Sequence, residues 1–180
     1  MSFKENNLKG ILPNEVSNLK YLQELTIYNR FDYYHEDYNM IYMVENEINK
    51  LTKLKSLTLR NLNITNISLS TIFGITSLEY LDLSYNNIQG SLVSNVCSPT
   101  ELKRLNLSNN LLSGSLHVFL SCKSPLEIIE LKYNKLNKEI PDLPSLSGTL
   151  KVLDVTGNNL SGEVSVCTIN NNNNKIIIII

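Results

Sequence analysis

The stretch LEYLDLSYNNIQGSL (Leu78–Leu92) is followed 24 residues later by a near copy, LKRLNLSNNLLSGSL (Leu102–Leu116). The same interval runs through most of the chain. The first aliphatic residue of each LxL pair stands at Leu25, Leu57, Leu81, Leu105, Ile129 and Leu153, so the steps are 32, 24, 24, 24 and 24 residues. Met1 and Phe3 fit the same frame one step before Leu25. Self-similarity at a fixed period of this length predicts a solenoid of stacked coils.

Within each repeat, the LxL segment alternates aliphatic and polar residues, which is the pattern of a β-strand with one buried face. A strand in a coil can bury this face only in the interior of its own coil. Its backbone then pairs with the strands of the coils before and after, about 4.8 Å away. We therefore expect a parallel sheet along one side of the solenoid, with helices or irregular turns along the other.

Further columns recur with the leucines, an asparagine after the strand and then a glycine. They stand as NNLKGILP (Asn6–Pro13), NNIQGSL, NLLSGSL, NKLNKEIP and NNLSGEV, and Lys138 interrupts the glycine column in the fourth of these. Over residues 1–164 the sequence resembles the leucine-rich repeat family, in particular its 24-residue, receptor-like subclass with the pattern LxxLxLxxNxLxGxIP. The resemblance implies an α/β solenoid: a right-handed superhelix with a parallel concave β-sheet and a helical or irregular convex side. Residues 165–180 follow as a low-complexity Asn/Ile tail.

The asparagine column is expected to be structural. In the family these residues form a ladder of buried side chains that bond to the turning backbone, because an amide can both donate and accept. The resemblance assigns this role to Asn6, Asn86, Asn110, Asn134 and Asn158. The plainer interpretation is the preference of asparagine for turns. The column is interrupted at Arg30 and Leu62, on either side of the one long step.

The long step holds eight extra residues, since 32 − 24 = 8, and we place this insertion within residues 31–43. Tyrosines 33, 34, 38 and 42 crowd around a histidine there, so the loop either packs on itself or forms a recognition surface. Val44, Ile48 and Leu51 then have helical spacing. Ile48 also belongs to a predicted outer-face core column, which consists of Val16, Ile48, Ile72, Val96 and Leu120. The outer face loses apolar residues in later coils. This loss predicts that the convex segments of those coils are extended or form short 3₁₀ helices instead of α-helices.

The variable strand positions face solvent on the concave side, and we predict that a protein or peptide binds there. The predicted contact residues are Tyr28, Arg60, Tyr80, Asp82, Tyr85, Arg104, Glu130, Tyr133 and Asp154. Tyrosine with mixed charge suits such partners. A second column alternates in sign through Lys55, Glu79, Lys103, Glu127 and Lys151. We interpret it as cross-strand support of the register.

Composition excludes several other functions. The formal net charge of −1 gives no basic stripe for nucleic acid. No apolar run approaches the roughly 18 residues of a membrane span, so no membrane insertion is expected. With two histidines and three cysteines, and without a phosphate-binding or zinc pattern, we predict no metal and no cofactor. No acid, base and nucleophile assemble in the pattern, so no catalytic residues are assigned and the chain is predicted not to be an enzyme.

The opening residues MSFKENNLKG lack the apolar stretch of a secretion signal, which predicts a cytoplasmic chain. The alternative is an extracellular or membrane-associated protein whose missing N-terminal region supplied a signal. Four glycosylation sequons, at Asn63, Asn66, Asn106 and Asn159, bear on the same question. Cys97 and Cys122 fall on successive coils, one position out of register. Two free thiols are expected, and a disulfide stays open if the compartment is oxidising.

The ends carry no capping units, so we expect a fragment or gene remnant of a longer array, whose uncapped ends could associate end to end. The function predicted from the sequence is a non-catalytic interaction module that binds a protein or peptide through its concave face. The alternative is a fragment of an extracellular receptor-like protein involved in ligand perception and signalling. A chain without a selected function is a further interpretation that its ends allow.

Overall fold

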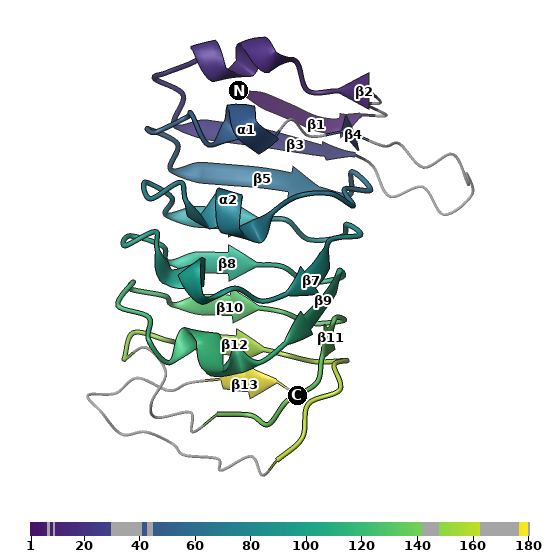
Figure 1. Cartoon of the computed structure of the whole chain (residues 1–180), viewed down its shortest axis with the longest axis vertical. Coiled ribbons are helices and arrows are strands. Elements are labelled where there is room, and N and C mark those ends of the chain that lie inside the picture. The colour runs from purple at the N-terminus through teal and green to yellow at the C-terminus, as the bar shows by residue number, and fades with distance from the viewer. Residues whose placement is uncertain are drawn as a thin grey trace.

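The computed structural model describes residues 1–6, 8, 10–29, 41–42, 45–141, 148–162 and 177–179. Parallel strands form an eight-stranded sheet along one side of the stacked coils (Figure 1). In spatial order they are β1 (Ser2–Asn6), β3 (Glu24–Asn29), β5 (Ser56–Arg60), β6 (Tyr80–Asp82), β8 (Arg104–Asn106), β10 (Ile128–Glu130), β12 (Val152–Asp154) and β13 (Ile177–Ile179). The predicted parallel sheet is therefore confirmed.

The register of this sheet follows the repeat frame. Leu57 pairs with Leu81, Leu81 with Leu105, Leu105 with Ile129 and Ile129 with Leu153. Leu25 pairs with Leu57 as well, across the long step. The long step therefore leaves the register between β3 and β5 the same as that between the other strands.

The aliphatic residues that define the repeat line one continuous core. Leu25, Leu57, Leu81, Leu105, Ile129 and Leu153 are all buried. Burying a leucine side chain stabilises a protein by about 1.5–3 kcal/mol, so this column is a main source of stability.

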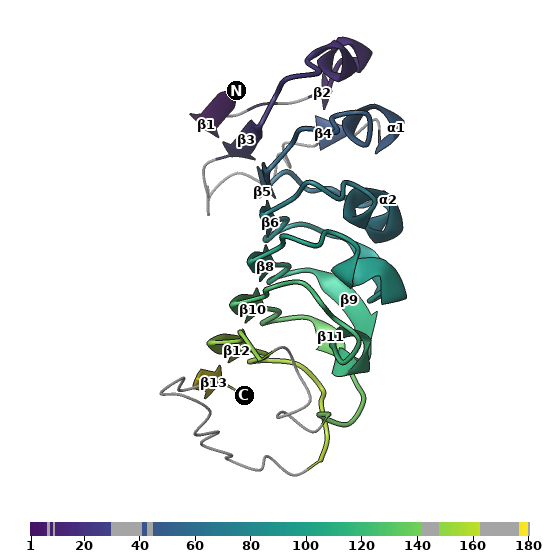
Figure 2. The same cartoon turned by 90° about the vertical axis from the view of Figure 1, so that its left-hand side faces the viewer.

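Short helices cover the convex side, opposite the sheet (Figure 2). They are the 3₁₀ helix η1 (Asn14–Asn18), α1 (Glu45–Ile48), α2 (Leu69–Phe73), η2 (Ser94–Cys97) and η3 (Leu116–Phe119). The expected short 3₁₀ helices on the convex side of later coils are seen in η2 and η3. The outer-face residues Val16, Ile48, Ile72 and Val96 are buried, but the prediction for Leu120 is wrong. Leu120 is 38% exposed, because η3 turns Leu116 and Phe119 into the core instead.

Two small sheets, not foreseen from the sequence pattern, connect the two sides. One joins β7 (Gln89–Ser91), β9 (Leu111–Gly114) and β11 (Lys135–Leu136), and the other joins β2 (Gly10–Ile11) and β4 (Ile41–Tyr42). Gly90 and Gly114 have φ of 102° and 96°, which explains the glycine column. Within the predicted insertion only Ile41–Tyr42 is described, and the rest of it lies outside the described residues. Of the predicted tail, Ile177–Ile179 forms β13, which pairs with β12.

Candidate binding face

The strands are held in place by the asparagine ladder, of which Asn110 is typical. Its Nδ2 donates to the carbonyl of Leu83 in the preceding coil at 3.0 Å and to Leu107 and Ser108 in its own coil at 3.1 and 3.3 Å. Its Oδ1 accepts from the N–H of Ile88 at 3.0 Å. The same arrangement recurs at Asn86, Asn134 and Asn158. These bonds tie consecutive coils together, so the ladder is confirmed at four of the five predicted positions.

The prediction for Asn6 is wrong. Asn6 is exposed, and its Nδ2 bonds only to Lys4 of its own strand, at 2.8 Å, among the described residues. Asn29, one residue before the interruption at Arg30, takes the ladder role in the next coil. It is 2% exposed and exchanges two hydrogen bonds of 3.0 Å with the backbone of Leu8. The register of β1 and β3 shifts between Lys4 and Asn6, which brings Asn6 opposite Asn29. An asparagine adjacent to the expected position was the only signal in the sequence.

The second interruption, at Leu62, is a hydrophobic replacement of a ladder residue. Leu62 is fully buried, and its N–H donates to Oδ1 of Asn86 in the next coil at 3.1 Å. The asparagine of the next coil, Asn86, thus supplies the ladder bond to this coil although Leu62 cannot supply one itself.

Tyr85 and Tyr133 lie just past the C-terminal ends of β6 and β10, in an unusual backbone conformation. Their φ angles are 57° and 53°, and Asn61, Asn109 and Gly157 have positive φ at the same position of their coils. Bulky residues seldom adopt this conformation. The turn presents the two rings outward, 38% and 57% exposed. A Cβ on Gly157 would lie 2.5 Å from Cδ1 of Tyr133, so glycine there leaves the space that the ring occupies.

Arginines hold two tyrosines of the face. The guanidinium of Arg60 lies 4.8 Å from the ring centre of Tyr85, and that of Arg104 lies 5.7 Å from the ring centre of Tyr80. Both are cation–π distances. Burial raises the pKa of the Tyr80 hydroxyl, and the nearby Asp82 carboxylate raises it further, so Tyr80 is protonated at neutral pH. The four side chains form a partly ordered surface before any ligand arrives.

The predicted aspartates support the turn behind this surface. Oδ1 of Asp82 accepts from the N–H of Ser84 at 2.9 Å, and Oδ1 of Asp154 accepts from the N–H of Thr156 at 3.1 Å. Asn106 makes the equivalent bond to Ser108 at 3.0 Å. Both aspartates are buried, so little of either carboxylate is left for a partner.

Asp154 should make stability sensitive to acid. Burial raises its pKa, but the hydrogen bonds from Thr156 and Lys132, whose Nζ lies 3.2 Å away, outweigh burial and leave the pKa below its ordinary value of 3.8. A group with a lowered folded pKa stabilises the protein above its unfolded pKa, and this contribution disappears as the pH falls through the folded pKa. We expect wild type to lose about 1 kcal/mol more than Asp154→Asn between pH 5 and pH 2.5.

Urea unfolding at the two pH values measures this difference. Asparagine is a matched replacement because Asn106 makes the same turn bond in a neighbouring coil. Equal acid sensitivity of the two proteins would show that Asp154 titrates normally.

An open cavity of about 820 Å³ lies on the concave face over β1, β3, β5 and β6. Four of the predicted contact residues line it, namely Tyr28, Arg60, Tyr80 and Asp82. Sequence reasoning missed Lys4, Glu24 and Ser56, which the strand alternation also points to this side. Tyr85, Arg104, Glu130, Tyr133 and Asp154 do not line the cavity and continue the face toward the C-terminal strands. The nine predicted residues therefore form one surface but not one pocket.

The alternating charge column forms the expected ion pairs. Lys55 and Lys103 lie 2.9 and 3.7 Å from Glu79, and Lys151 lies 2.8 Å from Glu127. The lysine contacts lower the pKa of both glutamates. All are cross-strand pairs between adjacent coils, which confirms the interpretation as register support.

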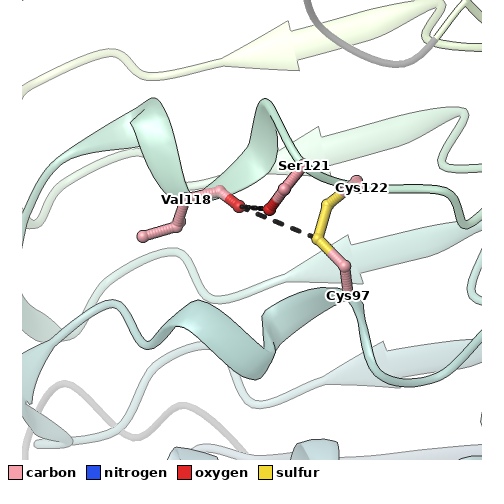
Figure 3. Close-up of a disulfide and its surroundings, with 4 residues drawn as sticks. All are labelled: Cys97, Val118, Ser121 and Cys122. Carbon is pink, nitrogen blue, oxygen red and sulfur yellow. Dashed lines mark hydrogen bonds between the residues drawn. A yellow bond between two sulfur atoms is a disulfide. The ribbon is translucent and has the colours of Figure 1, made fainter.

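On the convex side a disulfide joins two coils (Figure 3). Cys97, at the end of η2, is bonded to Cys122, just after η3, with their Cα atoms 5.1 Å apart. Val118 of η3 lies beside the bridge, and its carbonyl accepts from the Ser121 hydroxyl at 3.5 Å. The expectation of two free thiols is wrong, because stacking brings the Cα atoms within the range that a disulfide requires.

In the described part of the chain, no three His, Cys, Asp or Glu side chains gather where a metal ion could bind. Among the same residues no helix has the length and apolar character needed to cross a membrane.

Comparisons with known proteins agree with the geometry. Two family models, both described as leucine-rich repeat, match residues 52–112 and 148–163. A search of curated protein sequences finds no match. Among solved structures, the chain resembles the plant peptide hormone receptor RGFR1 in complex with RGF2, with 27% identity and a TM-score of 0.75, over 91% of this chain and 25% of the receptor chain.

Two Arabidopsis ectodomains are also similar. The ectodomain of the receptor kinase HAESA, in complex with an extended IDA peptide hormone, has 25% identity and a TM-score of 0.75 over 91% of this chain and 26% of its own. That of the receptor kinase SOBIR1 has 33% identity and a TM-score of 0.57 over 66% of this chain and 64% of its own. The chain thus spans about a quarter of the length of the first two receptors.

These findings correct the predicted location. Ectodomains lie outside the cell, so the similar structures point to an extracellular setting, and the prediction of a cytoplasmic chain is wrong. The disulfide agrees with an oxidising compartment. Leucine-rich repeats are generally scaffolds for interaction and not for catalysis. From the repeat register, the asparagine ladder and these similarities, the chain belongs to the leucine-rich repeat family, in its receptor-like subclass.

Proposed function

We propose that this chain is a non-catalytic binding module that takes a peptide, or an extended segment of a protein, on its concave face. The observation that carries the proposal is the pre-formed surface: an open cavity of about 820 Å³ that continues into tyrosines held by arginines. A surface ordered in advance loses less conformational entropy when it binds. RGFR1 and HAESA, two similar structures, are both complexes with peptide hormones.

Tyr85 and Tyr133 are the proposed anchors for the partner. Tyrosine supplies a large contact area with few rotatable bonds, and it is enriched among residues that dominate binding energy. Both rings are exposed, and both have their backbones fixed by the turn. Tyr28, Arg60, Tyr80, Arg104 and Glu130 complete the face, whereas Asp82 and Asp154 act mainly by holding the backbone behind it.

A displayed library of random dodecapeptides, selected against the immobilised chain, provides the probe. We expect selected peptides to bind the Tyr85→Asn, Tyr133→Asn double variant at least about tenfold more weakly than wild type. Asparagine is the appropriate replacement because the chain has Asn61 and Asn109 at the same positive-φ position. Isothermal titration calorimetry measures the affinity, and circular dichroism checks that the fold is intact.

Tyr21→Asn is the matched control. Tyr21 is 91% exposed and lies between η1 and β3, outside the concave strands, so its loss should leave the affinity unchanged. If the double variant bound as tightly as wild type, or if Tyr21→Asn weakened binding equally, the concave face would not be the binding site.

A second candidate is a role in ligand perception and signalling as part of an extracellular receptor-like protein. The similarity to receptor-kinase ectodomains favours it. Both candidates use the same face, and the signalling role additionally requires the chain to act within a membrane receptor.

A further inference from the structure

We propose that Asn66 and Asn159 carry N-linked glycans, and that the other two sequons, at Asn63 and Asn106, stay bare in the folded protein. All four asparagines begin an N-x-S/T triplet. Partial burial and a hydrogen bond separate Asn63 from the two proposed sites, and its position on the concave sheet separates Asn106 from them. The inference depends on the extracellular setting and not on the identity of any ligand.

Asn66 is exposed and stands two residues before Ser68, the N-cap of the convex helix α2. Its side chain makes no hydrogen bond to any described residue. A glycan here would extend into solvent beside the convex side and would leave the core and the concave sheet untouched. Ser68 supplies the hydroxyl of the sequon, and in the folded chain that hydroxyl accepts from the N–H of Thr71 at 3.3 Å.

Asn159 is exposed as well. It follows the ladder residue Asn158, and its backbone N–H donates to the Leu136 carbonyl at 2.8 Å, which leaves its side chain out of the coil contacts described. Ser161, the third residue of this sequon, is paired with Glu139 along the lateral side. This position is also away from the concave strands.

The remaining two sequons have side chains that the fold already uses. Asn63 is half-buried, and its Oδ1 accepts from Nδ2 of Asn87 in the next coil. Asn106 is the last residue of β8 and lies within the concave sheet, between Asp82 and Glu130 on the adjacent strands, and its Oδ1 accepts from the N–H of Ser108. With strands about 4.8 Å apart, a sugar on Asn106 would stand among the side chains of the concave face.

The modification is a group transfer from a lipid-linked oligosaccharide diphosphate. The side-chain amide nitrogen of the asparagine forms a bond to the anomeric carbon of the sugar, and the bond from that carbon to the phosphate oxygen breaks. The lipid diphosphate leaves, and the amide nitrogen gives up one proton to a base of the transferase. No electrons are exchanged with an oxidant or reductant.

The test is site mapping on the full chain, secreted from insect cells behind a cleavable leader. Peptide N-glycosidase in ¹⁸O-labelled water converts each glycosylated asparagine to labelled aspartate, which mass spectrometry locates. We expect label at Asn66 and Asn159 and none at Asn63 or Asn106. The variants Asn66→Gln and Asn159→Gln should each lose one glycan and migrate faster on a denaturing gel than wild type. The double variant should lose both glycans and migrate as the deglycosylated chain does.

Label at Asn63 or Asn106 in the secreted, folded chain would overturn the assignment, and so would an unlabelled Asn66 or Asn159. Because neither proposed glycan lies on the concave face, enzymatic removal of the glycans should leave peptide affinity unchanged. A large change in affinity would mean that the sugars lie on the binding surface, against the placement argued here.

Discussion

Asn110→Ala is expected to lower the free energy of unfolding by about 4 kcal/mol. The amide of Asn110 satisfies three backbone carbonyls and one N–H in two consecutive coils. Alanine leaves these groups buried without the amide, and each such group costs roughly 1–3 kcal/mol, partly relieved by relaxation and water. Urea unfolding followed by far-ultraviolet circular dichroism measures the loss, because the chain has no tryptophan.

Asn159→Ala, in unglycosylated protein, is the control for this variant. It changes an exposed asparagine whose side chain has no hydrogen bond to a described residue, so stability should change by less than about 0.5 kcal/mol. A loss below about 1 kcal/mol for Asn110→Ala would mean that the ladder bonds contribute little and that the asparagine column reflects only turn preference.

Removal of the disulfide with Cys97→Ser and Cys122→Ser is expected to destabilise the protein by about 3 kcal/mol. The bridge closes a loop with a sequence separation of 25 residues. Chain-entropy estimates for such a loop lie between those for 15 and 100 residues, about 3 to 4.7 kcal/mol, and measured effects are commonly smaller. Unfolding wild type in urea with and without a reducing agent makes the same comparison without a substitution.

Cys167→Ser provides the matched control because Cys167 is the third cysteine and does not belong to the bridge. The reductant should destabilise Cys167→Ser as much as wild type and should have no effect on the double variant. If the reductant left wild type unchanged, the bridge would contribute nothing to stability in solution.

The repeat frame could be predicted from the sequence because each column has a direct physical requirement. An aliphatic residue every 24 positions must enter the core, and Leu57, Leu81 and Leu105 do so in register. The cross-strand charges around Glu79 could be predicted for the same reason, since parallel strands in register place equal positions side by side.

The features that escaped prediction depend on small local displacements. A one-residue register shift leaves Asn6 outside the ladder and puts Asn29 in it instead of Arg30, and the turn of η3 exposes Leu120. The disulfide required knowing that an offset of one position on the convex side still leaves the Cα atoms 5.1 Å apart. The cavity lining combines side chains from four strands, so Lys4, Glu24 and Ser56 could not be selected from their own coils alone.

For the candidate site, the sequence indicated the correct face but not the role of each residue. Strand alternation places Tyr80, Asp82, Arg104 and Asp154 on the concave side. It does not indicate that the aspartates bond to the backbone or that the arginines lie over the tyrosine rings. The aspartate bonds and the contact between Arg60 and Tyr85 arise from the turn after the strand, where Tyr85 adopts a positive φ. Arg104 and Tyr80, by contrast, are register partners on β8 and β6.

Photo-crosslinking with a selected dodecapeptide that carries a benzophenone side chain shows whether the partner binds on the concave face. After irradiation, mass spectrometry of the digested complex locates the linked residues on the chain. Binding on the concave face predicts crosslinks to β5, β6, β8 and β10 and to the turns that hold Tyr85 and Tyr133. Crosslinks concentrated on α2, η2 and η3 of the convex side would contradict it.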